Sequence, residues 1–293
     1  VYTTISNLGV GTLAYTFPEF AALDLLNNPD VPKNTPGSPV ETRSDVEMEK
    51  GDVSMDGTGY PIVLGAGGPD AFGYVWIDSD EDGGPAFNWI DIAATGTAVS
   101  TSTLGDDGIV GPFNMGFGFE FYEEVKTQFW IASNGAVSFD GDYFTYSNTT
   151  IPTNSSSYVD FIAPFWDDMY SAYAGCAIYY QNFADYTVVM YDNTSKLGAE
   201  AYKMDMEVIM YKNGKIKVQY KDITAGFTLN SATVGIQSSD PSLGLQVSNN
   251  TNYVHNNLAI LYSLPADFII AVEPSHGFVP EDGSVDITIT YDS

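Results

Sequence analysis

Hydrophobic residues recur in short runs from about Tyr60 onward, and turn-forming residues separate these runs. In the run at 203–211, KMDMEVIMY, hydrophobic and polar residues alternate, as in a strand with one face in a core and the other in water. The hydrophobic face would hold Met204, Met206, Val208 and Met210, and the polar face Lys203, Asp205 and Glu207. An Asn213-Gly214 pair follows, which is the strongest short signal for a β-hairpin. Many short strands with such turns predict an all-β fold, an antiparallel β-sandwich.

Helical periodicity is scarce and indicates at most one short helix. The best candidate covers residues 17–28, where hydrophobic residues lie three apart. Residues 29–59 are rich in Pro, Gly, Asp, Glu and Ser and predict an extended connector. We therefore predict four parts: an N-terminal strand pair (1–20), a helix and connector (21–60), a β-sandwich with an acidic loop (61–264), and C-terminal strands (265–293).

Each end of the chain has the β pattern of an Ig-like half-domain, yet neither end is long enough for the roughly 100 residues of a whole Ig-like sandwich. The C-terminal run alternates strictly and places Val285, Ile287 and Ile289 on one face. A strand edge of this kind pairs with another strand unless something covers it. We expect Val285, Ile287, Ile289, Ile5 and Leu13 to form assembly contacts. The two ends could complete each other within one chain, or each copy could lend a strand to the next and so build a head-to-tail filament.

The charge balance restricts the partners. The chain has 38 acids and 10 bases, a net charge of −28, so it lacks the clustered Lys and Arg that bind nucleic acid or an anionic membrane. A cation-rich environment suits this charge, although solubility alone is an equally good explanation. No stretch approaches the ~18 hydrophobic residues of a membrane span. The single Cys, Cys176, excludes an intrachain disulfide.

The densest acidic stretch, WIDSDEDGG, contains the pattern D-x-D-x-D-G. Alternate carboxylates on a tight loop can converge on Ca²⁺, which takes 6–8 oxygen ligands. The predicted ligands are Asp78, Asp80, Asp82 and Asp91. The loop is not an EF-hand, because its twelfth position is Trp89 and its flanks are β-like. The alternative interpretation is a solvated acidic turn.

Two further acidic pairs are candidates for chemistry. Asp106 and Asp107 lie in a Gly-rich turn that suits a solvated loop, and Asp167 and Asp168 follow an aromatic strand, where a carboxylate pair could do acid–base work or bind a metal ion. The chain has no G-x-S-x-G nucleophile motif, no phosphate-binding Gly loop with Lys, and only two His, far apart in sequence. We therefore expect a protein that is not an enzyme.

The middle of the chain resembles the nidogen-like β domain. The matching stretches are GPFNMGFGFEFY (111–122), FWIASNGAVSF (129–139), FIAPFWDD (161–168) and GCAIYYQ (175–181). The stretch around the acidic loop, and the Ig-like strands at both ends, resemble bacterial secreted proteins in which such modules stand beside peptidase or adhesive domains. The resemblance implies an extracellular or cell-surface location more firmly than any activity.

Two functions follow as hypotheses. In the first, the protein is a non-catalytic subunit or repeat of an extracellular filament, with calcium as a structural ion and copies of itself as partners. In the second, it is an adhesion module of a secreted multidomain peptidase and contacts cell-surface or matrix components.

Overall fold

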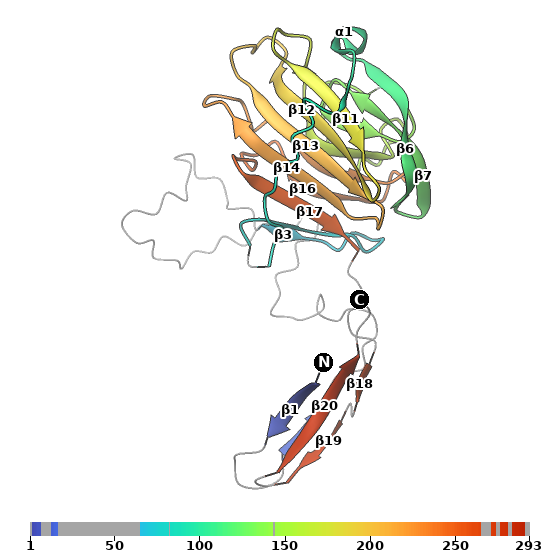
Figure 1. Ribbon diagram of the computed structural model, residues 1–293, viewed down its shortest axis with the longest axis vertical. Coiled ribbons are helices and arrows are strands. Elements are labelled where there is room, and N and C mark those ends of the chain that lie inside the picture. Colours follow the sequence, from blue (N-terminus) through green and yellow to red (C-terminus); the bar gives the residue numbers. More distant parts are fainter. Residues whose placement is uncertain are drawn as a thin grey trace, which may run out of the picture. The chain divides into compact units, whose positions relative to one another are not determined.

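The computed structural model describes residues 2–6, 13–16, 65–81, 83–142, 144–264, 271–273, 276–280 and 283–290. The chain divides into two compact units, one built from residues 1–33 and 265–293 and the other from 34–264. The helix expected at 17–28 and the connector expected at 29–59 lie outside the described residues. The larger unit is an antiparallel β-sandwich, which confirms the predicted fold class (Figure 1).

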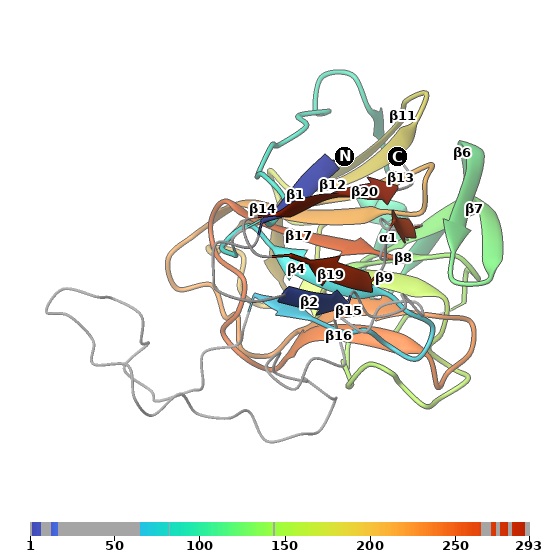
Figure 2. The same ribbon diagram turned by 90° about the horizontal axis from the view of Figure 1, so that it is seen from below.

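Two sheets form the sandwich. One is nine-stranded, with β3-β4-β17-β14-β13-β12-β11-β5 in order and β10 paired to β12; the other has the order β16-β15-β9-β8-β7-β6. Seen from below, β14 and β17 lie in one layer and β9, β15 and β16 in the other (Figure 2). The strands of the first sheet are β3 (Ala66–Gly67), β4 (Val75–Asp78), β5 (Thr97–Ala98), β10 (Met169–Tyr170), β11 (Ala177–Asn182), β12 (Tyr186–Lys196), β13 (Met204–Tyr211), β14 (Ile216–Ile223) and β17 (Leu258–Ser263). Those of the second are β6 (Ile109–Phe121), β7 (Glu124–Ala132), β8 (Ala136–Ser138), β9 (Phe161–Trp166), β15 (Thr233–Gln237) and β16 (Gly244–Asn249).

The main core lies between the two sheets. The inward-facing residues of β13 are those that the alternation predicts: Met204, Met206, Val208 and Met210. They belong to the same hydrophobic cluster as Phe119, Phe121 and Phe129 of the other sheet. The predicted hairpin joins β13 to β14, with Gly214 at a φ of 81° that favours glycine. The only helix in the described part of the chain is α1 (Thr101–Leu104), whose N-cap Ser100 accepts a hydrogen bond from the Thr103 N–H.

The outer face of β13 is buried rather than exposed to solvent. The solvent-exposed polar face that the alternation predicted is therefore wrong. Glu207 is 0% exposed and Asp205 9%. Residues 85–96 cross this face, and Ile92 packs there against Val188, Met190 and Ile209. The outer face of the second sheet is likewise covered, since Phe144 and Ile151 pack on Phe161 and Trp166. Covering segments of irregular structure have no hydrophobic period, so alternation along the strand alone does not reveal them.

The smaller unit joins the two ends of the chain. Its strands are β1 (Tyr2–Ser6), β2 (Leu13–Thr16), β18 (Ala271–Glu273), β19 (His276–Val279) and β20 (Ser284–Thr290). β20 lies between β1 and β18, and β19 pairs with β2, all antiparallel. Ile5 is the Cα partner of Val285, and Leu13 that of Val279. Within one chain, therefore, the two ends complete each other.

The predicted assembly residues differ in exposure. Ile287 is 0% exposed, Val285 is half-buried, and Leu13 is 40% exposed. The side chains of Ile5 and Ile289 lie outside the described set, although the backbone places both in strands. In the described residues, no helix is long and hydrophobic enough to cross a membrane.

Candidate functional site

The acidic loop begins at Asp78, the last residue of β4, and this carboxylate points inward. Asp78 is 3% exposed; its Oδ2 accepts a hydrogen bond from the Tyr253 hydroxyl and its Oδ1 one of 3.0 Å from the Asp80 N–H. Burial raises the pKa of Asp78, and the Tyr253 hydrogen bond opposes that shift. A Cβ on Gly65 would lie 2.4 Å from Asp78 Oδ1, so a larger residue there would displace the Asp78 side chain. Both oxygens of Asp78 thus have structural partners.

The other predicted calcium ligands lie apart from one another. The exposed Asp80 has its Oδ2 2.9 Å from Nε2 of His255. Asp82 lies outside the described residues. The exposed Asp91 accepts a hydrogen bond of 3.0 Å from the Ala93 N–H, and its charge raises the pKa of Glu207 on the outer face of the first sheet. The described residues do not bring Asp78, Asp80 and Asp91 into one group of converging carboxylates.

One group of three carboxylates does converge in the described part of the chain. The ligand oxygens of Asp106, Asp107 and Asp168 all lie within 4.8 Å of one another. Asp106 and Asp107 follow α1, whereas Asp168 follows β9. Asn134, which is 0% exposed, connects the two segments: its Nδ2 donates to Asp107 Oδ1 at 2.9 Å, and its Oδ1 accepts from the Met169 N–H at 3.2 Å. The two acidic pairs of the sequence analysis therefore meet at one place.

The electrostatics of this group favour a cation. Burial raises the pKa of Asp168, the charges of Asp106, Asp107 and Asp167 raise it further, and only Lys196 opposes them. Lys196 is itself engaged, with its Nζ 2.6 Å from Asp167 Oδ2. Three carboxylates supply a substantial share of the 6–8 oxygens that Ca²⁺ takes. The arrangement offers carboxylate oxygens from two segments of the chain, which are the kind of ligand that a hard divalent cation takes.

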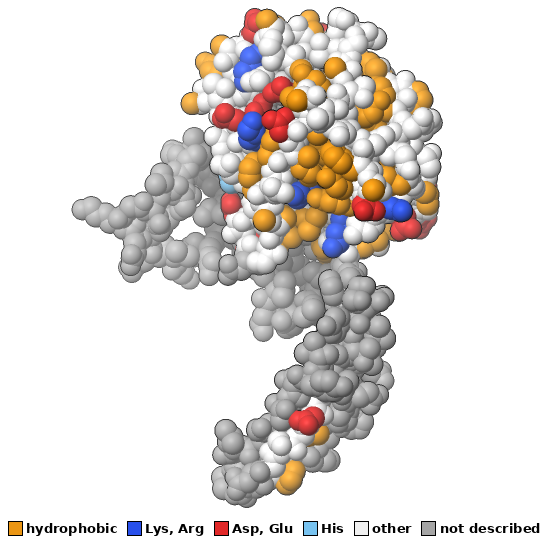
Figure 3. Space-filling view, viewed as in Figure 1, with side chains coloured by type: hydrophobic (Ala, Val, Ile, Leu, Met, Phe, Trp, Pro, Cys, Tyr) orange, Lys and Arg blue, Asp and Glu red, His pale blue; other side chains and the backbone are white. Residues whose placement is uncertain are grey.

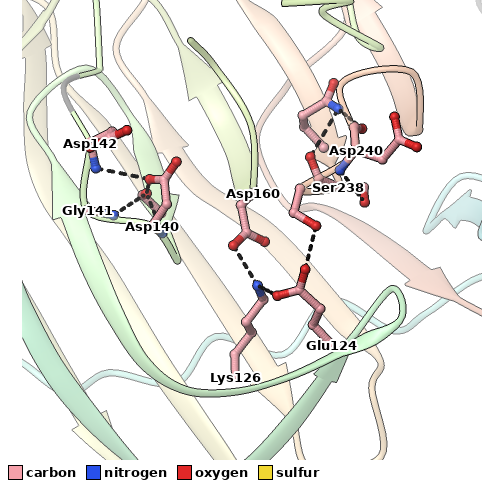
Figure 4. Close-up of polar contacts among 11 residues, drawn as sticks. Glu124, Lys126, Asp140, Gly141, Asp142, Asp160, Ser238 and Asp240 are labelled. Carbon is pink, nitrogen blue, oxygen red and sulfur yellow. Dashed lines mark hydrogen bonds and ion pairs between the residues drawn. The ribbon is translucent and has the colours of Figure 1, made fainter. Parts of the chain in front are cut away.

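A second cluster surrounds Lys126 (Figure 4). Lys126 is 8% exposed, and its Nζ lies 2.5 Å from Asp160 Oδ2 and 2.6 Å from Glu124 Oε2. The Ser239 hydroxyl donates to the other oxygen of Glu124 at 2.6 Å. Asp160 Oδ1 is buried and accepts no hydrogen bond from the described residues. Sequence reasoning missed this cluster, because Lys126 and Asp160 lie 34 residues apart and each resembles an ordinary strand-end charge.

A third polar cluster lies on the outer face of β13. Glu207 Oε1 accepts hydrogen bonds from the Ile90 N–H at 3.2 Å and from Gln219 Nε2 at 2.5 Å. Burial raises the pKa of Glu207 to about 7, the two hydrogen bonds and Lys217 oppose the shift, and Asp91 adds to it. Sequence reasoning missed Glu207 because alternation placed it in water. Its buried position comes from the covering segment 85–96.

Comparison with known families gives one match. The family described as NIDO related matches residues 83–268, well over half of the chain. No curated protein and no solved structure matches the chain. The matched region contains the converging carboxylates, the Lys126 cluster and Glu207.

Proposed function

Because the chain belongs to the NIDO-related family, we propose that it is a non-catalytic subunit of an extracellular surface filament whose copies exchange terminal β-strands head to tail. Domains of this nidogen-like type are typically extracellular, adhesion-type modules and are generally not catalysts. The filament and the strand exchange are the parts that need support from the terminal unit.

The observation that carries the proposal is the pairing of the chain ends. In the described residues, β1 and β2 pair only with β20 and β19. Each of these pairs joins an N-terminal strand to a C-terminal strand, and the whole larger unit lies between them in sequence. A second copy could supply β1 and β2 in the same register and with the same hydrogen bonds. The unit is therefore suited to exchange without any new interface.

Chain length allows the exchange. About 50 residues separate β2 from β3, and a chain of that length reaches roughly 160 Å at full extension. The N-terminal strands are therefore not restricted by length to their own copy. Because lending from head to tail does not close on itself, repeated exchange would produce a filament rather than a dimer.

The register provides the experiment. Thr4 and Asp286 are Cα partners in β1 and β20, and cysteines at facing positions of antiparallel strands come close enough for a disulfide. The chain with Thr4→Cys, Asp286→Cys and Cys176→Ser is oxidised at high protein concentration with calcium and run on a denaturing gel. Strand exchange gives a ladder of covalent multimers. Monomers with an internal disulfide at every concentration would rule the proposal out.

Two matched variants complete this test. The Thr4→Cys chain with Cys176→Ser carries one cysteine and cannot form a ladder longer than a dimer. A chain that ends at Leu264 lacks β18, β19 and β20 but keeps the larger unit. It should stay folded and remain monomeric, and filaments formed by it would contradict strand exchange.

Calcium is a separate part of the proposal. We propose that Ca²⁺ binds at Asp106, Asp107 and Asp168, which is supported by the convergence of their oxygens and by the raised pKa of Asp168. Asp78, Asp80 and Asp82 of the acidic loop are the alternative position. Bound calcium would offset the mutual repulsion of carboxylates that the charge of −28 makes general in this chain.

A second candidate function, an adhesion module of a secreted multidomain peptidase, rests on the surface of the first sheet. Hydrophobic side chains gather on its outer face (Figure 3), among them the half-buried Phe183, Tyr186 and Tyr211. The Phe183 and Tyr186 rings stack with centroids 4.5 Å apart. Half-exposed aromatics suit contact with a partner surface. Tyr186→Ala should then weaken binding to cell-surface or matrix material without affecting assembly, and equal binding by both proteins would contradict this function.

A further inference from the structure

Lys126 and Asp160 connect two strands that are not neighbours. β7 and β9 lie on either side of the short β8, which pairs with β7 only from Trp130 to Ala132. Lys126 lies on the part of β7 that extends past the end of β8, and Asp160 immediately precedes β9. The Lys126 side chain therefore reaches across the open end of β8, where its Nζ lies 2.5 Å from Asp160 Oδ2 (Figure 4).

The two side chains of this pair are buried beside aromatic rings. The Lys126 and Asp160 side chains are 9% and 7% exposed. The Phe139 ring centroid lies 5.9 Å from Nζ, and the fully buried Phe119 is the Cα partner of Lys126 on β6. Burial raises the pKa of Asp160, with Lys126 opposing the shift. Burial in a low-dielectric site therefore penalises the charged carboxylate of Asp160 and favours its neutral acid.

A third group is placed to move protons. Glu124 Oε2 lies 2.6 Å from the same Nζ, and the Ser239 hydroxyl holds its other oxygen. Glu124 is half-exposed, so it exchanges protons with water, unlike Asp160. The amine thus has one buried carboxyl as a partner and a second carboxylate beside it.

We propose that Lys126 and Asp160 form an intramolecular isopeptide bond between Nζ and Cγ, and that Glu124 transfers the proton that the reaction moves. The bond would tie β7 covalently to β9 across the end of β8.

The reaction balances without a co-reactant. A proton passes from the Lys126 ammonium to Asp160, which leaves a neutral amine and a carboxylic acid. The Nζ lone pair attacks Cγ and forms the C–N bond, while Glu124 takes a proton from Nζ and returns it to the Asp160 hydroxyl. The C–O bond then breaks, and one water molecule leaves. Fixed proximity of this kind reaches effective concentrations on the order of 10⁵ M or more, and exclusion of bulk water disfavours hydrolysis of the product.

A second Lys–Asp pair in the same domain lacks these features. Lys196 Nζ lies 2.6 Å from Asp167 Oδ2, but Lys196 is 16% exposed and its other partner is the Ser231 hydroxyl rather than a carboxylate. Asp167 Oδ1 also accepts a hydrogen bond from the Asp168 N–H. The Lys196–Asp167 pair is therefore a matched control: it tests whether a short distance between a lysine and an aspartate is by itself enough for bond formation.

The test is the intact mass of the folded, purified full chain measured after denaturation. The bond makes the protein lighter than its sequence by one water molecule. A protease that cuts after aromatic residues then cleaves at Phe129, Trp130 and Phe139 and would leave one branched peptide that contains both Lys126 and Asp160. Full sequence mass in the folded wild-type protein would overturn the proposal. So would loss of water that maps to any other pair of residues, including Lys196 and Asp167.

Three variants assign the roles. Lys126→Arg keeps the positive charge but cannot form the amide, so it should show full sequence mass with unchanged circular dichroism. Lys196→Arg should retain the loss of one water. Glu124→Gln changes a half-exposed residue and should slow bond formation at least tenfold while the protein stays folded. Bond formation at the wild-type rate in that variant would remove Glu124 from the reaction.

Discussion

The Ile90 N–H donates a hydrogen bond of 3.2 Å to Oε1 of Glu207, so a fully buried carboxylate on β13 holds an irregular segment against the outer face of its sheet. Gln219 on β14 strengthens this attachment. Its side chain accepts from the Asn88 N–H at 2.7 Å and donates to the Asn88 carbonyl at 2.8 Å. Two side chains therefore satisfy backbone groups that the segment 85–96 cannot pair within a strand of its own.

The buried Glu207 predicts a pH dependence of stability. Its pKa is about 7 in the folded protein and near 4.5 when unfolded, so the folded state binds this proton more tightly. The free energy of unfolding should thus fall by about 3 kcal/mol as the pH rises from below 4.5 to above 7. Glu207→Gln keeps an acceptor for Ile90 and should remove this decrease. Urea unfolding of the wild-type protein and of Glu207→Gln at several pH values tests this prediction. If the free energy of unfolding changes with pH in the same way in both, Glu207 is not the titrating group.

The hydrogen bond between Tyr253 and Asp78 predicts a loss of stability on its removal. Tyr253→Phe takes away the donor to Asp78 Oδ2 and leaves a buried carboxylate with one partner fewer. We expect the free energy of unfolding to fall by about 1–3 kcal/mol at neutral pH. Tyr146→Phe is the matched control, because Tyr146 is 53% exposed. Equal stability of the two variants would show that the bond contributes nothing.

Calcium binding predicts a response to chelation. A chelator should lower the melting temperature. Calcium at about 100 times its dissociation constant should raise it again, because binding adds about 2.7 kcal/mol to the free energy of unfolding. Asp168→Asn should abolish the response, whereas Asp80→Ala should leave it intact, if the ion lies at the converging carboxylates. The opposite pattern would place the ion in the acidic loop. A wild-type melting curve that chelator and calcium both leave unchanged would remove calcium from the proposal.

The turn between β7 and β8 predicts an unusually sensitive glycine. Gly135 has a φ of 71°, and a Cβ there would lie 2.0 Å from the Phe165 carbonyl oxygen. Gly135→Ala should therefore lower the free energy of unfolding by about 3 kcal/mol or more. Gly175 has a similar φ of 80° with open space around it, so Gly175→Ala should lower the free energy of unfolding by only about 1 kcal/mol. The free energies of unfolding are measured by chemical denaturation. If both variants lose a similar amount, the positive φ alone, and not the contact with the Phe165 carbonyl, makes alanine unfavourable at position 135.

Features that depend on neighbouring residues were predictable from the sequence. The alternation of β13 identified Met204, Met206, Val208 and Met210 as inward-facing, because successive strand residues point to opposite faces. The Asn213-Gly214 pair identified the hairpin, because a tight turn needs a residue that adopts positive φ at low cost. These signals, with the resemblance to the nidogen-like domain, were sufficient for the fold class.

The polar clusters were decided by tertiary structure alone. Lys126 meets Asp160, and Asp106 meets Asp168, because the order of strands in the second sheet and the loops at its ends bring distant segments together. Glu207 is buried because an irregular segment covers it. The sequence by itself determined the β-sandwich and the inward face of its strands, since strand periodicity and turn conformation are properties of adjacent residues. Only the tertiary structure decided which charges lie together and which lose water, since both depend on strand order and on covering segments that have no period of their own.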